Sequence, residues 1–103
     1  MNKNKWEEIR LSMYNLGINM KTVIKWRTKD VKNGYISNWD GEWYYHFKNG
    51  GYETIEWLEI STPNSTIKEA ILNELKKIHI LGKIQEGSIM IYGYPNDSSI
   101  FYL

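Results

Sequence analysis

The sequence contains no cysteine. Disulfide bonds, thiolate chemistry and metal sites built on sulfur are therefore excluded. Long hydrophobic runs are also missing, because no stretch of about 18 apolar residues occurs that could span a bilayer. Residues 1–10 are polar and charged and lack the apolar stretch of a signal peptide. We therefore expect a cytoplasmic protein that does not contact a membrane.

Aromatic residues are abundant, with five Trp and eight Tyr among 103 residues. Hydrophobic residues make up 42% of the chain, which is enough to bury a core that offsets the entropy lost on folding. The length fits one domain and leaves little room for a second core. We therefore expect residues 1–103 to form a single domain that folds without a metal or a cofactor.

The net charge is only +1, but its distribution is uneven. Residues 1–32 carry eight basic and three acidic side chains, a net of +5, whereas residues 33–62 carry one basic and five acidic side chains, a net of −4. In so small a protein the positive charge of the first segment is nearly cancelled by the negative charge of the second. Few phosphates of a nucleic acid could therefore be neutralised at once. We therefore expect any binding to nucleic acid to be weak and non-specific.

Two segments have the periodicity of amphipathic helices. In each, a capping residue is followed three positions later by Glu, as in the pairs Asn4–Glu7 and Thr66–Glu69. The patterns predict helices over residues 5–16 and 66–78. Their apolar positions are Trp6, Ile9, Met13 and Leu16 in the first, and Ile67, Ala70, Ile71, Leu75 and Ile78 in the second.

Alternating apolar and polar residues predict β-strands. We predict strands over 21–30, 42–48, 52–60, 79–84, 88–94 and 100–103, with a turn at 95–98 before the last. Strands 42–48 and 52–60 should form an antiparallel hairpin, and 52–60 should be central and buried on both faces. The apolar phases predict a core that contains Ile24, Trp26, Trp43, Trp57, Leu58, Ile71 and Leu75.

These elements predict the fold class α+β. The sheet should be mainly antiparallel with five or six strands, and two helices should pack on one face of it. The order along the chain is α-β-β-β-α-β-β-β.

Motifs for catalysis are missing from the sequence. The two histidines, His46 and His79, are not at metal-ligand spacing from each other or from a matching carboxylate. There is no nucleophile elbow, and no glycine-rich loop opens a helix to hold a phosphate. We therefore predict no metal site, no cofactor and no catalytic residue.

Aromatic residues near predicted turns are the candidates for a binding site. Aromatic anchors with a polar rim are typical of protein-binding hot spots. The candidate binding residues are Tyr35, Trp39, Asp40, Glu42, Tyr44, His46, Tyr52 and Glu53. Aromatic side chains that merely cover a sheet edge are the equally weighted alternative.

Several Trp-rich motifs extend over nearly the whole chain. They lie at residues 26–30, 34–47 and 55–60, with Trp6 near the start and residues 91–94 near the end. With these motifs the sequence resembles a small bacterial family of domains of unknown function, DUF6678. The resemblance implies single-domain cytoplasmic proteins and a role near toxin-immunity or phage-defence systems. It implies no catalytic residues.

Three hypotheses for function remain open. The first is a non-enzymatic protein-binding domain, such as an immunity protein that blocks a basic toxin with its aromatic and acidic surface. The second is a nucleic-acid-binding domain that uses the basic strand 21–32. The third is a small hydrolase that uses carboxylates within residues 40–59. The oligomeric state is left open.

Overall fold

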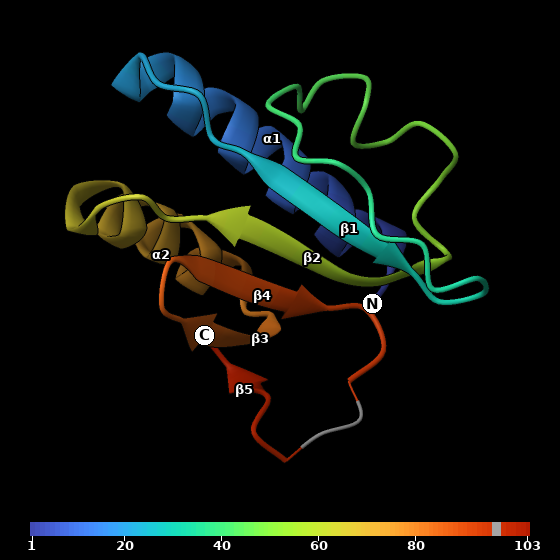
Figure 1. Cartoon of the computed structure of the whole chain (residues 1–103). Coiled ribbons are helices and arrows are strands. Elements are labelled where there is room, and N and C mark those ends of the chain that lie inside the picture. The colour runs from blue at the N-terminus through green and yellow to red at the C-terminus, as the bar shows by residue number, and fades with distance from the viewer. Residues whose placement is uncertain (96–97) are drawn as a thin grey trace.

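The computed structural model describes residues 1–95 and 98–103 as two helices on one face of an antiparallel sheet (Figure 1). The sheet has five strands in the order β1-β2-β4-β3-β5, which confirms the α+β prediction. The predicted turn at 95–98 includes residues outside the described part. The elements in chain order are α1 (Lys3–Met20), β1 (Trp26–Asp30), β2 (Ile55–Ser61), α2 (Ser65–Ile78), β3 (Leu81–Gln85), β4 (Ser88–Tyr92) and β5 (Phe101–Tyr102).

Both helices are capped two residues earlier than predicted, and each begins one residue before the predicted cap. The side chain of Asn2 accepts the N–H of Lys5 at 2.9 Å, and the side chain of Asn64 accepts the N–H of Ile67 at 2.9 Å. Asparagine in an extended conformation satisfies a free N–H of the first helical turn, so these residues replace Asn4 and Thr66 as caps. Helix α1 also continues four residues beyond the predicted end and stops where Lys21 adopts a left-handed conformation.

The predicted strand 42–48, and with it the predicted hairpin, is wrong. Residues 43–50 form successive turns, and β1 pairs directly with β2, with Trp26 opposite Ile60. Trp43 and Phe47 are both buried, which fits positions four apart on one side of a helical turn. The alternation of aromatic residues in this segment is therefore not a strand pattern.

The segment of residues 35–40, which we call the edge segment, runs back along the outer edge of β1. The N–H of Asp30 donates to the main-chain oxygen of Tyr35 at 2.8 Å, and the N–H of Ser37 donates to that of Thr28 at 2.9 Å. Isolated bridges at both ends of the segment pair Lys29 with Ile36 and Trp26 with Asp40. The edge segment therefore pairs with the side of β1 that faces away from β2, although no strand was predicted over residues 35–40.

Strand β2 lies between β1 and β4, as its predicted central position required. An irregularity in the register next to Asp30 skips Glu56, so that Ile55 joins Leu58 and Ile60 in the buried cluster. Trp57 is half-buried outside that cluster, so the predicted burial of β2 on both faces is wrong. The helices cover one face of β2 and leave the other face to polar and aromatic side chains.

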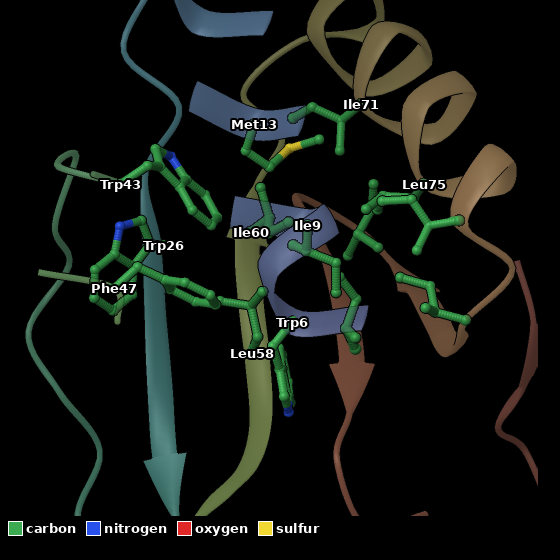
Figure 2. Packing of buried hydrophobic residues seen from close by; sticks show 14 of the residues in the cluster. Trp6, Ile9, Met13, Trp26, Trp43, Phe47, Leu58, Ile60, Ile71 and Leu75 are labelled. Atoms are coloured by element: carbon green, nitrogen blue, oxygen red, sulfur yellow. The ribbon is translucent and has the colours of Figure 1, made fainter. Parts of the chain in front are cut away.

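The core lies between the sheet and the two helices (Figure 2). Six of the seven predicted core residues are buried, and the exception is Trp57. The indole N–H of Trp43 donates to the main-chain oxygen of Ile24 at 2.8 Å, and that of Trp26 donates to Glu42 at 3.1 Å. The two indoles therefore bury their rings without leaving a polar group unpaired.

We expect Leu58→Ala to lower the free energy of unfolding by about 2–5 kcal/mol, because Leu58 is fully buried at the centre of the cluster. Ile84→Ala on β3 is the matched control, since Ile84 is exposed. That change should lower the same free energy by less than about 1 kcal/mol. Urea unfolding of the three proteins measures both values, and equal losses would contradict the placement of the core.

Candidate functional site

The structure distributes the eight candidate residues over three places. Tyr35, Trp39 and Asp40 lie on the edge segment, and Glu42, Tyr44 and His46 lie at the start of the turns at 43–50. Tyr52 and Glu53 lie where the connection returns to β2. The carboxylate of Asp40 joins the first two places, because it lies 2.8 Å from the Nδ1 atom of the exposed His46.

The carboxylates of Asp40 and Glu42 hold the connection in shape. Glu42 accepts the main-chain N–H groups of Tyr44, Tyr45 and His46 at 2.6 to 2.9 Å. Burial alone would raise the pKa of both carboxyls, but these N–H groups lower the pKa of Glu42. The N–H of Glu42 and the His46 ring lower that of Asp40 in the same way. Both carboxylates are therefore occupied within the chain.

Trp39 lies on the sheet face that the helices leave open. Its ring centroid is 4.6 Å from the guanidinium carbon of Arg27, which is a cation–π contact. Arg27 also pairs with Glu59 at 2.7 Å, and Lys29 pairs with Glu56 at 3.3 Å. Trp39 is thus a surface residue held by its neighbour. The two cations of β1 are neutralised by carboxylates on β2.

Tyr52 is buried and faces α1 instead of solvent. Its hydroxyl donates to the carboxylate of Glu7, which also pairs with the buried Arg10 at 2.7 Å. Arg10 in turn donates to the main-chain oxygen of Tyr44 at 2.8 Å. The hydrogen bonds from Arg10 and Tyr52 lower the pKa of Glu7 to about 2. Burial and the hydrogen bond to Glu7 raise the pKa of the Tyr52 hydroxyl. Tyr52 therefore holds the connection against α1, and little of its side chain is open to solvent.

Tyr44 belongs to a group of exposed aromatic rings that spans two elements. Its ring centroid lies 5.4 Å from that of Tyr14 on α1 and 4.8 Å from that of Tyr45. Arg10 and Lys48 lie over the Tyr44 ring at 5.3 and 5.5 Å. These contacts hold three adjacent tyrosine rings at the surface, where they remain partly open to solvent.

A groove of about 720 Å³ begins at Tyr14. Ile18 and Val23 line it and are mostly exposed, with 65% of Val23 open to solvent. Gly41 forms part of its wall and lies so close to Val23 that a Cβ atom on residue 41 would be 2.4 Å from the Val23 Cγ1 atom. We call the exposed group around this groove the tyrosine surface, which comprises Tyr14, Ile18, Val23, Tyr44 and Tyr45.

Four of these five residues were not among the candidates predicted from the sequence, and Tyr44 is the exception. One signal for them is a second apolar stripe on α1, because Leu11, Tyr14 and Ile18 recur at spacings of three and four outside the phase of the buried residues. Tyr45 lies within the predicted strand 42–48, which does not form. Val23 lies in the extended residues before β1, which the predicted strand 21–30 included.

The chemistry that the described side chains could perform is limited. No group of three or more His, Asp or Glu side chains among the described residues is arranged to hold a metal ion. In the region of the hydrolase alternative, Asp40, Glu42, Glu56 and Glu59 each bond to a group within the chain. No helix in the described part of the chain is long and apolar enough to cross a membrane.

Comparison with known proteins agrees with the resemblance noted in the sequence. The sequence model of a family described as "Family of unknown function (DUF6678)" matches residues 1–98. No curated protein and no solved structure matches the chain significantly.

We expect the Glu7 carboxylate to make the fold sensitive to acid. Its pKa falls from 4.5 to about 2 on folding, so its contribution to stability is present above pH 4.5 and is lost as the pH falls through 2. Between these values the free energy of unfolding of Glu7→Gln should fall less steeply than that of the wild type. Glu8→Gln changes the exposed neighbour and should behave like the wild type. Urea unfolding at several pH values tests this, and parallel curves for all three proteins would contradict it.

Proposed function

We propose that this chain, which belongs to the DUF6678 family, is a non-enzymatic protein-binding domain that contacts its partner through the tyrosine surface. The observation that carries this proposal is the meeting of Tyr14, Tyr44 and Tyr45 beside an apolar groove. Exposed apolar patches of this kind mark interaction sites in otherwise polar surfaces.

The physical chemistry of tyrosine supports this use. A tyrosine ring buries a large area at a small entropic cost, and its hydroxyl still forms hydrogen bonds at an interface. Here Arg10 and Lys48 already restrain the ring of Tyr44, so little additional freedom is lost on binding. The groove next to Tyr14 offers a place for an apolar anchor of the partner.

Whether the partner should be basic depends on whether the acidic side chains are free to bind it. The sequence favoured a basic toxin, because Asp40 and Glu42 were expected to face it. Both carboxylates are occupied by internal hydrogen bonds, so apolar and aromatic contact supplies most of the affinity. A toxin-immunity or phage-defence role in a bacterial cytoplasm is the specific form of this proposal, and it rests on the family resemblance.

The two alternative functions have less support in the geometry. A nucleic-acid site on strand 21–32 would use Arg27 and Lys29, which are paired with Glu59 and Glu56. A hydrolase would use a carboxyl with a raised pKa, whereas those of Asp40 and Glu42 are lowered. Both remain predictions, ranked below protein binding.

We expect Tyr45→Ala to weaken partner binding by about tenfold or more if the ring is an anchor of the interface. The partner would be identified by affinity capture from cells that express the protein, and its dissociation constant would be measured by calorimetry with purified components. Tyr35→Ala is the matched control, because Tyr35 is as exposed as Tyr45, at 63% against 64%, but lies on the edge segment.

Val23→Asp provides a second test, because it places a charge at the groove without disturbing a buried residue. It should also weaken binding, and the melting temperatures of both variants should stay within a few degrees of the wild type. Equal affinity of Tyr45→Ala, Val23→Asp and the wild type would refute the tyrosine surface as the binding site.

A further inference from the structure

The edge segment forms an outer strand edge whose main chain is partly unpaired. Its inward groups bond to β1 through the oxygen of Tyr35 and the N–H of Ser37. Ile36 lies between these two bonds, opposite Lys29, and in an antiparallel pair the N–H and C=O of such a residue point away from the neighbouring strand. Among the described residues, no group bonds to the main chain of Ile36.

The edge segment has little of the protection that strand edges usually carry. Edges are normally blunted by Lys, by Pro or by charged side chains, because unpaired N–H and C=O groups bind other strands. The edge segment contains no Pro and no Lys, and Asp40 at its end is its one charged residue. Instead, Tyr35, Ile36 and Trp39 are exposed there, the last two at 45% and 41%.

The opposite edge of the sheet has fewer unpaired main-chain groups and carries a protecting charge. There β5 covers the start of β3 by pairing with Leu81 and Gly82, and the uncovered part of β3 carries Lys83. That edge is therefore short and charged. The edge segment is the side of the sheet on which strand pairing is least opposed.

We propose that two copies of the chain pair edge to edge through their edge segments, antiparallel and about a two-fold axis at Ile36. Each Ile36 would donate its outward N–H to the outward oxygen of Ile36 in the other copy. The two five-stranded sheets would then continue into each other. This inference is independent of the proposed function, which uses the tyrosine surface.

The charges at the two ends of the edge segment fit this arrangement. Lys32 lies in the turn at one end, and Asp40 lies at the other, each four residues from Ile36. Antiparallel pairing about Ile36 brings the end with Lys32 near the end with Asp40 of the other copy, twice. Asp40 keeps its negative charge for this long-range attraction, although its oxygens bond within the chain. Parallel pairing would place like ends together instead.

The irregular backbone of the edge segment limits the strength of this pairing. The bridges of Ile36 and Asp40 span four residue steps, whereas Lys29 and Trp26 on β1 span three, so the segment contains a bulge. Only the residues nearest Ile36 can form a regular ladder. We therefore expect a weak dimer, with a dissociation constant on the order of 0.1 mM.

Sedimentation velocity of the full chain from about 10 µM to about 1 mM tests the pairing, and the mass should rise from monomer towards dimer over this range. Ile36→Pro should shift the transition to at least tenfold higher concentration, because Pro removes the outward N–H without breaking a bond to β1. Ile36→Val is the matched control and should dimerise like the wild type.

A second pair of variants tests the charge complementarity and does not alter the strand. Lys32→Glu should weaken the dimer, because it brings a carboxylate towards Asp40 of the other copy. Lys68→Glu makes the same change of charge on α2 and should leave the dimer unchanged. Hydrogen exchange of the Ile36 amide in the wild type should slow as the concentration rises. A monomer at all concentrations, or a dimer unaffected by Ile36→Pro, would overturn the proposal.

Discussion

The hydrogen bond from the Trp43 indole to the main chain of Ile24 determines where the connection between β1 and β2 can lie. It brings a buried ring from the middle of that connection to the residues that precede β1. Phe47, one turn later, packs edge-on against Trp26 at 5.2 Å. Because these rings are fixed in the core, Tyr44 and Tyr45 between them are held at the surface. The connection is therefore anchored in the core by its aromatic rings, although residues 43–50 form turns and no strand.

Hydrophobic periodicity correctly predicted the helices and strands whose apolar residues follow only one periodicity. Helix α2 and strand β4 lie almost where the pattern placed them, because each buries one face or lies within the sheet. The connection failed because Trp43, Tyr45 and Phe47 satisfy an alternating pattern, while Trp43 and Phe47 alone satisfy a helical turn. The carboxylate of Glu42 decides between the two, since it accepts three successive N–H groups. Such a local bond is not visible in the periodicity.

The sequence predicted the residue types of the candidate site better than the positions of the individual side chains. The sequence identified an aromatic connection with acidic residues, and Trp39 and Tyr44 are indeed exposed. It could not show that Tyr52 turns inward to Glu7, because that contact joins residues 45 positions apart. Counting charges also overstated the acidity available to a partner. A carboxylate that fixes its own loop keeps its charge but loses its free hydrogen-bonding positions.

The wall of the groove depends on the absence of a Cβ atom at Gly41. A Cβ atom at this position would overlap the Val23 side chain, and the backbone there does not require glycine for its conformation. A single methyl group on residue 41 would therefore force the Val23 side chain, which also lines the groove, to move, while the charge of the surface stayed the same. Substitution of residue 41 by alanine would therefore alter the shape of the surface separately from its charge.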